Sequence, residues 1–348
     1  MLRASTLAIS LVLGCGEAAA PSAAPPAQSP VPAAAPAPPV ATERIDMHVH
    51  LVDDAVDELL AALDRAGIRQ AVVLSTPHLD ALHRPAPGTD PFADFRGANE
   101  RLLAQTRAHR ERLRPFVTLD PAQVKVGEVT DWLDRGACGV KLYIGNHDMR
   151  RRPLADPSHD ALFTLLEQRQ VPLLLHVNTF RYEDELAALL RAHPRLEVVC
   201  AHLCGSRTDL DRFERILRAH PTLRVDTSHG PGPPGIAGFT NLERERERLR
   251  RLIEAEPERF LFGSDLVTSV SDNREAMRAD WDRQVAANLG LIAADSFEFW
   301  RTGERPGNLA LDRYEGLALT EPALTAVLGG NARRWLAGCD PGDRPSRQ

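Results

Sequence analysis

From residue 44 onwards, short apolar runs alternate regularly with longer amphipathic segments. The apolar runs are rich in β-branched and aliphatic residues, as in Val72-Val73-Leu74, which is typical of strands buried on both faces of a parallel sheet. The predicted strands cover residues 45–50, 71–75, 114–119, 139–144, 172–176, 197–202, 223–227 and 260–265.

The segments between these runs have helical periodicity. In residues 55–66, for example, Leu59, Leu60 and Leu63 fall on one face, and Gly67 follows as a helix-stop residue. The other predicted helices cover residues 99–112, 126–135, 160–170, 182–193, 210–220, 241–256 and 322–336.

This strict alternation predicts an α/β fold, and within that class a (β/α)8 TIM barrel with right-handed crossovers. The alternative is a doubly wound open sheet with a glycine-rich nucleotide-binding turn. It is disfavoured because no G-x-G-x-x-G follows the first strand and the chain contains no P-loop motif.

A long segment, residues 267–320, separates the eighth predicted strand from the last predicted helix. It carries Trp281, Phe297, Phe299, Trp300 and Tyr314, although only 5% of the chain is aromatic. On a barrel this segment would emerge at the C-terminal face, so we expect a helical insertion that forms a lid or subdomain over the site. A peripheral patch or a contact within a homodimer is the alternative.

The N-terminus has the features of a secretory signal. Arg3 precedes the apolar stretch 7–13, which is too short to span a bilayer, and Gly14-Cys15 follows. Residues 12–15 resemble the bacterial lipobox, so we expect an exported lipoprotein attached to the membrane through lipid on Cys15; an ordinary cleaved signal is the alternative. The predicted organisation is a signal at 1–15, a disordered Pro/Ala-rich tether at 16–42, the barrel at 43–338 and a tail at 339–348.

Composition narrows the class of partner. The 348 residues are 43% hydrophobic and 26% charged, as in soluble globular proteins, and the net charge of −6 gives no electrostatic reason to expect a nucleic acid. The four cysteines after Cys15 permit disulfides in an exported protein, but their spacing selects no pair. Cys200 and Cys204 flank a histidine, which could indicate a metal; the apolar run around Cys200 favours a small buried hydrophobe instead.

Polar residues that could bind a metal stand at or near the ends of five predicted strands. They are His48, His50, Lys141, His176, His202 and Asp265. The C-terminal strand ends of a barrel form one rim, so these side chains should converge although they are far apart in the sequence. Imidazole and carboxylate groups gathered in this way predict a metal centre.

The segments around these residues resemble the markers of the amidohydrolase superfamily. They are residues 45–50, 139–142, 175–176, 200–202 and 262–265, together with Gly329-Gly330-Asn331-Ala332-Arg333-Arg334 in the last predicted helix. The resemblance is closest to the amidohydrolase-related branch (amidohydrolase family 2), and it covers roughly residues 43–338.

The resemblance implies that His48, His50, His176 and Asp265 hold one or two divalent ions, with zinc as the first choice. It also implies that Asp265 takes the proton of a metal-activated water and passes it to the leaving group. His202 would be either a ligand of a second metal or a protonated group that stabilises an oxyanion.

Lys141 is one of only two lysines in the chain, the other being Lys125. In binuclear members of the superfamily a lysine on the fourth strand is carboxylated and bridges two metals. An unmodified lysine near the substrate and a plain structural ion pair are the alternatives.

The predicted function is hydrolysis of an amide, lactone, ester or related bond of a small molecule. A zinc-dependent decarboxylase of the same branch and a catalytically silent exported binding protein are the alternatives. His78, His147 and His229, which follow strands, and the run Arg150-Arg151-Arg152 are weaker candidates for substrate contacts.

Overall fold

The computed structural model describes residues 43–80, 90, 92–144, 151–230, 233–302 and 309–339. The predicted signal, the predicted tether and residues 340–348 of the predicted tail lie outside these residues. The chain divides into two units, Met1–Pro36 and Ala37–Gln348, and every element described below belongs to the second. None of the helices in the described residues combines the length and the apolar character needed to cross a bilayer.

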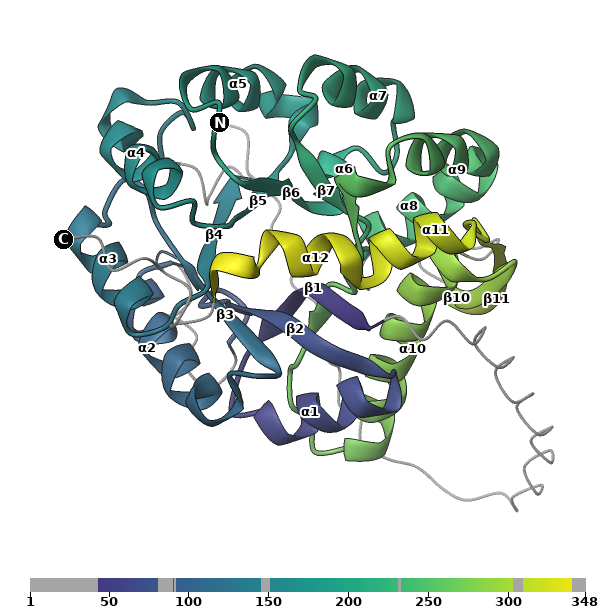
Figure 1. The fold of residues 1–348 in the computed structure, drawn as a ribbon. Coiled ribbons are helices and arrows are strands. Elements are labelled where there is room, and N and C mark those ends of the chain that lie inside the picture. Colours follow the sequence, from purple (N-terminus) through teal and green to yellow (C-terminus); the bar gives the residue numbers. More distant parts are fainter. Residues whose placement is uncertain are drawn as a thin grey trace, which may run out of the picture. The chain divides into compact units, whose positions relative to one another are not determined.

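One parallel sheet forms the centre of the molecule (Figure 1). Its strands are β1 (Arg44–Leu51), β2 (Ile68–Ser75), β3 (Leu113–Thr118), β4 (Gly139–Ile144), β5 (Leu173–Val177), β6 (Val198–Cys200), β7 (Arg224–Asp226), β8 (Phe260–Leu261) and β9 (Leu266–Val267). They pair in the order β8-β7-β6-β5-β4-β3-β2-β1-β9. From β1 to β8, neighbours in the sheet are therefore neighbours in the sequence, as successive strand–helix–strand crossovers require.

The eighth predicted strand is interrupted, and this interruption closes the barrel. Its first part, β8, pairs with β7, and its continuation, β9, pairs with β1. Between them the amide of Met47 in β1 donates to the carbonyl of Phe262 at 2.9 Å. Because β8 and β9 are two parts of the same predicted strand, the sheet closes on itself. The predicted (β/α)8 barrel is therefore confirmed.

Helices surround the strands (Figure 1). They are α1 (Val56–Arg65), α2 (Phe95–Thr106), α3 (Val126–Asp134), α4 (Asp160–Gln168), α5 (Thr179–Ala192), α7 (Leu210–Ala219), α8 (Pro233–Arg244) and α9 (Arg246–Ala255), with α6 (Ala201–Gly205) a single turn after β6. In α7 the carboxylate of Asp209 caps the first turn by accepting from the amide of Arg212 at 3.0 Å, while Phe213 and Ile216 are buried. The single helix predicted at 241–256 is two helices, because the backbone leaves the helical region at Glu245.

The insertion after the eighth strand contains a long helix, as predicted, and a β-hairpin that was not predicted. It contains α10 (Arg274–Ala293) and then an antiparallel hairpin of β10 (Ser296–Thr302) and β11 (Leu309–Glu315). Phe297 and Phe299 alternate with polar residues along β10 and are buried, which is the period-two pattern of a half-buried strand. These aromatic residues pack on Phe239 of α8, so the insertion shares the core of the barrel.

The C-terminal helices cross the N-terminal end of the barrel (yellow in Figure 1). They are α11 (Glu321–Thr325), a π-helical turn (Ala326–Gly330) and α12 (Asn331–Trp335). The side chain of Asn331 donates to the carbonyl of Phe260 at 2.7 Å, and that of Trp335 donates to the carbonyl of Glu197 at 3.1 Å. This end of the barrel is thereby covered, and a disulfide between Cys138 and Cys339 fastens the chain after α12 to the start of β4.

Gly329 gives a test of this closure. A Cβ at Gly329 would collide with the backbone carbonyl oxygen of Glu43, whereas a Cβ at Gly127, on the exposed side of α3, meets nothing within 4 Å. We expect Gly329→Ala to lower the free energy of unfolding by about 1–3 kcal/mol through overpacking. Gly127→Ala should raise it by up to about 1 kcal/mol through helix propensity. Urea denaturation measures both, and equal effects of the two substitutions would contradict the packing described here.

Candidate metal centre

A bulge in β1 turns its two histidines towards the barrel interior. The register of β1 against β2 shifts between Asp46 and Val49. Before the shift, Met47 packs with the cluster that contains Leu174 and Trp335; after it, Val49 packs with the residues that face the helices. Since a bulge moves the following side chains to the opposite face, His48 and His50 are placed at the interior end of the strand.

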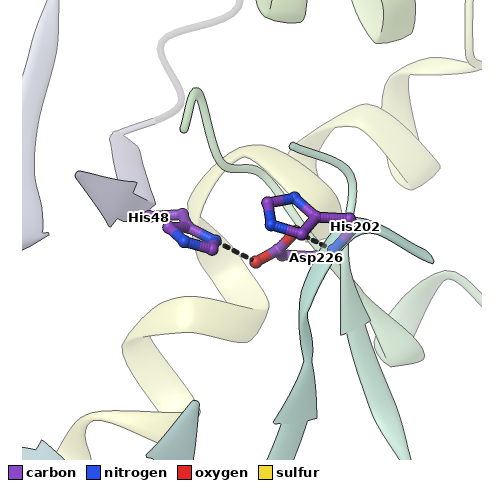
Figure 2. A group of neighbouring side chains, drawn as sticks. All are labelled: His48, His202 and Asp226. Carbon is purple, nitrogen blue, oxygen red and sulfur yellow. Dashed lines mark hydrogen bonds and ion pairs between the residues drawn. The ribbon is translucent and has the colours of Figure 1, made fainter. Parts of the chain in front are cut away.

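His48 is held by a buried carboxylate. Its Nδ1 lies 2.8 Å from Oδ2 of Asp226, at the end of β7, and both side chains are fully buried (Figure 2). Burial alone would raise the pKa of Asp226, but the charge of His48 and hydrogen bonds from His48 and Ser228 outweigh burial and lower that pKa. The ionised carboxylate can only accept, so Nδ1 of His48 donates and, in the neutral ring, Nε2 carries a lone pair.

His50 has an analogous arrangement with a hydroxyl. Its Nδ1 is 2.9 Å from Oγ1 of Thr76 and 3.3 Å from the hydroxyl of Tyr143. Burial lowers the pKa of His50 to about 4, so the ring is neutral at physiological pH. When Thr76 accepts the Nδ1 proton, Nε2 is left as an acceptor directed at Asp265.

Asp265 stands where the eighth strand is interrupted, with a φ of 54°. Its Oδ1 lies 3.0 Å from Nε2 of His50 and 3.3 Å from Nε2 of His48. Burial acts to raise its pKa, but the neighbouring imidazoles of His202, His48 and His50 outweigh burial and lower that pKa well below its usual range. The side chain is 16% exposed, so a small molecule can reach it.

His202 and His176 complete the group of imidazoles. The ring of His202 stacks on that of His48 at 4.8 Å between centroids, and the edge of His176 meets it at 4.9 Å. Nδ1 of His202 lies 2.9 Å from the hydroxyl oxygen and 3.2 Å from the carbonyl oxygen of Ser228. Since that hydroxyl donates its proton to Asp226 and the carbonyl can only accept, Nδ1 donates to Ser228. Burial lowers the pKa of His202 to about 3.

Lys141 projects from β4 into the same group. Its Nζ is fully buried, 3.1 Å from Nε2 of His48 and 4.9 Å from the centre of the Tyr143 ring. Burial lowers the pKa of Lys141 to about 8. Among the described carboxylates, none lies within ion-pair distance of Lys141, so its surroundings are those of a site residue more than of a structural ion pair.

Imidazole nitrogens and a carboxylate oxygen, which are potential metal ligands, converge at the centre of this group. In two sets of three residues, each residue has one potential metal-ligand atom within 4.8 Å of those of the other two. The first set is His48, His50 and Asp265, and the second is His48, His202 and Asp226. In the first set, two imidazole nitrogens and a carboxylate oxygen face one another at 3.0–3.3 Å. A divalent cation could bind all three of these atoms as ligands, and nitrogen and oxygen ligands suit zinc. In the second set, Asp226 is already bonded to His48 and orients it.

The structure brings all six predicted site residues to one end of the barrel. His176 belongs to neither set of three, although its ring contacts His202. Of the weaker candidates, His78 packs against the ring of Tyr143 at 5.0 Å, and Arg151 is bonded to the carboxylates of Asp90 and Asp120. His147 and Arg150 lie outside the described residues.

Cys200 is buried, as expected for a small apolar residue, but its sulfur is bonded to that of Cys204. Neither thiol is therefore available to a metal. The disulfide spans the turn α6, in which His202, Leu203 and Cys204 all have positive φ. Each non-glycine residue in this left-handed conformation costs about 1–2 kcal/mol.

Sequence reasoning missed Asp226 and Arg207. Asp226 lies inside a predicted strand, and the signal that could have identified it is a carboxylate near the C-terminal end of that strand, where the barrel mouth lies. Arg207 has a buried Nη1 without a hydrogen-bond partner among the described residues. Its positive charge lowers the pKa values of His202 and His229, in each case after burial as the larger cause. Arg207 is thus a second cation beside the centre.

The insertion also reaches the centre. From α10, the side chain of Gln284 donates to the carbonyl of Ser264 at 2.8 Å, and that of Asn288 donates to the carbonyls of Ser264 and His229 at 3.0 Å. Asn288 also accepts from the amide of His229 at 2.8 Å. These two amides fix the backbone immediately before Asp265.

Comparisons with solved structures support this fold. Solved structures with the same fold include an amidohydrolase II (17% identity, TM-score 0.55, 85% of this chain and 100% of that chain). They also include an amidohydrolase from Burkholderia multivorans with bound zinc (16%, 0.56, 85% and 99%). A third is a proposed 2-pyrone-4,6-dicarboxylic acid hydrolase from Pseudomonas putida (18%, 0.53, 86% and 98%).

No curated protein matches the chain. The family model described as amidohydrolase matches residues 45–337, which span the whole barrel and every residue of the candidate centre. The chain therefore belongs to the amidohydrolase family.

Proposed function

We propose that the protein is a metal-dependent hydrolase that uses water to cleave an amide, lactone, ester or related bond of a small molecule. The observation that carries this proposal is the convergence of three potential metal-ligand atoms, the Nε2 atoms of His48 and His50 and Oδ1 of Asp265. The zinc bound in the amidohydrolase from Burkholderia multivorans supports the choice of ion.

His48, His50 and Asp265 would hold the ion, with His176, His202 and Lys141 beside them. When bound, a zinc ion lowers the pKa of a coordinated water towards about 7 and polarises a carbonyl oxygen. Asp226 and Thr76 would keep the two imidazoles in the tautomer that binds, because the carboxylate of Asp226 accepts from Nδ1 of His48 and the hydroxyl of Thr76 can accept from Nδ1 of His50.

Asp265 is the candidate for proton transfer. Its Oδ1 faces the two histidines, and its Oδ2 lies next to Gly230, where a Cβ would approach it to 2.5 Å. The absence of a side chain at Gly230 leaves this oxygen accessible. Oδ2 would accept a proton from the attacking water and return it to the leaving nitrogen or oxygen.

His202 and Lys141 retain two roles each within this proposal. A neutral His202 offers Nε2 as a second-metal ligand, which its low pKa favours over a protonated oxyanion-stabilising group. Lys141 would be either a carboxylated bridge between two metals or a free amine near the substrate. Its lowered pKa leaves a larger fraction of free amine for reaction with carbon dioxide than an ordinary lysine has.

The charges around the centre favour an anionic substrate. Asp226 and Asp265 are ionised, and Lys141 and Arg207 balance them, whereas burial raises the pKa of Asp46 to about 7. A divalent cation would add a surplus of positive charge, which is costly in a buried site unless anionic groups accompany it. The buried, unpartnered Nη1 of Arg207 would bind a carboxylate of the substrate.

Metal analysis of the purified protein tests the proposal most directly. We expect one or two zinc ions per chain and loss of hydrolysis on treatment with a chelator, because the attacking water needs the ion. His50→Ala should lose the metal, whereas His109→Ala, in a short helix on the outside of the barrel, should retain it. A protein that binds no metal under any reconstitution would refute the mechanism.

Intact mass measurement on the same preparation decides the state of Lys141. A binuclear centre requires a lysine heavier by one carbon dioxide molecule together with two metals per chain. Products separate the remaining alternatives: release of carbon dioxide indicates a decarboxylase, and a new carboxyl group indicates a hydrolase. A metal-loaded protein that leaves a broad panel of esters, lactones and carboxylates unchanged would indicate a binding protein.

Asp226→Asn tests the orientation of His48. An amide cannot supply the negative charge that holds the Nδ1–H tautomer, so zinc affinity should fall about 10- to 100-fold. Asp134→Asn, which removes the charge of an exposed partner of Arg169, is the matched control and should leave affinity unchanged. Competition with a chromophoric chelator measures both, and equal affinities would contradict the assigned role.

Arg207→Met tests the preference for anionic substrates. On pairs of esters or lactones that differ by one carboxylate, we expect KM for the carboxylated member to rise roughly 10- to 100-fold, as for loss of a hydrogen bond to a charged group. Arg218→Met, at an 80% exposed side chain, is the control for lost charge. An unchanged preference in the Arg207 variant would exclude this contact.

A further inference from the structure

The disulfide between Cys200 and Cys204 spans the turn that carries His202. The two cysteines lie on either side of this histidine, one at the end of β6 and the other within α6. Because the bond closes so short a loop, it restrains the backbone on both sides of His202 directly.

This turn has a backbone that its residues do not favour. The φ angles of His202, Leu203 and Cys204 are 59°, 50° and 58°, and Gly205 follows at 65°. In an L-residue this conformation brings Cβ close to the next carbonyl oxygen, so left-handed residues other than glycine normally occur singly. Three in succession require restraints from outside the local sequence preference.

Hydrogen bonds and packing attach the turn to its neighbours. The amide of His202 donates to Oδ1 of Asp226 at 2.8 Å, and the hydroxyl of Thr179 donates to the carbonyl of Cys204 at 2.6 Å. A Cβ at Gly205 would lie 2.5 Å from the carbonyl oxygen of Val177. These contacts fix the turn against β7 and β5, and the disulfide adds a covalent restraint along the turn itself.

The position of the turn determines where the imidazole of His202 lies. That ring donates from Nδ1 towards Ser228 and contacts the rings of His48 and His176, at 4.8 and 4.9 Å between centroids. A return of residues 202–204 to negative φ would redirect the side chain and break these contacts together.

We propose that the Cys200–Cys204 disulfide is a positioning element of the centre, which keeps His202 against His48 and His176 by holding the turn in its left-handed form. The proposal rests on the hydrolase function proposed above, since it assigns the bond a part in that site. An oxidising compartment, to which the predicted export signal would direct the chain, preserves such a bond.

The second disulfide provides a matched control. Cys138 and Cys339 are separated by 201 positions and lie at the covered end of the barrel. Stabilisation by a disulfide increases with the length of the loop that it closes, so this bond should contribute more to stability than the short one. Removing it should lower stability without moving His202.

The test compares Cys200→Ala/Cys204→Ala with Cys138→Ala/Cys339→Ala in the full chain. In protein labelled with ¹⁵N-histidine, the Nδ1–H signal of His202, assigned with His202→Asn, reports its bond to Ser228 without need of metal or substrate. We expect the first variant to lose this signal and roughly 10- to 100-fold of its hydrolytic rate. The second should keep both and unfold at a lower urea concentration.

A third variant separates geometry from stability. In Cys200→Ala/Cys204→Gly, glycine adopts positive φ without steric cost, so the turn should form again without the bond. We expect the His202 signal and part of the hydrolytic rate to return. Recovery with glycine but not with alanine is the result that a purely stabilising disulfide would not give.

Three results would overturn the proposal. The first is an unchanged His202 signal in Cys200→Ala/Cys204→Ala. The second is a loss of signal in both double alanine variants that is proportional to the loss of stability in each. The third is the finding of free thiols at Cys200 and Cys204 in peptide maps of the wild-type protein. A wild-type protein without hydrolytic activity in which the signal still depends on the disulfide would refute the hydrolase and support the positioning role.

Discussion

The carboxylate of Asp226 is the contact on which the geometry of the centre depends. It accepts from the ring of His48 and from the backbone amide of His202, each at 2.8 Å, and from the hydroxyl of Ser228 at 2.6 Å. One buried group thus connects β1, α6 and β7, which are separate in the sequence. A buried charge is costly unless its lone pairs are used, and here each bond that offsets this cost also positions a residue of the centre.

Asp46 has a complementary role with a different charge. Its Oδ1 accepts from the amides of His48 and Ser264, both at 3.0 Å, and so joins β1 to the interruption of the eighth strand. Burial raises its pKa to about 7, whereas the pKa of Asp226 is lowered. The difference follows from the partners, because Asp226 has an imidazole beside it and Asp46 has mainly neutral amides and a hydroxyl.

The sequence was sufficient to predict the barrel and the six residues at its mouth. Strands that alternate with helices run parallel to one another, so their C-terminal ends lie together at one end of the barrel. The sequence was not sufficient for features that depend on contacts across the barrel. The bulge that turns His48 inward is a shift in the register of β1 against β2, which the residues of β1 alone do not reveal. In the sequence, little distinguishes Asp226 from the other carboxylates; only the fold brings His48 and His202 next to it. The pairing of Cys200 with Cys204 likewise requires a left-handed turn that local propensities argue against.

The insertion supports the centre as well as extending the fold. Where the eighth strand is interrupted, the carbonyl of Ser264 accepts from the side chains of Gln284 and Asn288 on α10. A buried carbonyl that no strand pairs must be satisfied by another donor, and the insertion supplies two. The backbone before Asp265 can therefore leave the sheet without an unsatisfied polar group. Asp265 adopts its positive φ and faces the two histidines of β1 because a segment outside the repeating strand–helix pattern stabilises the break.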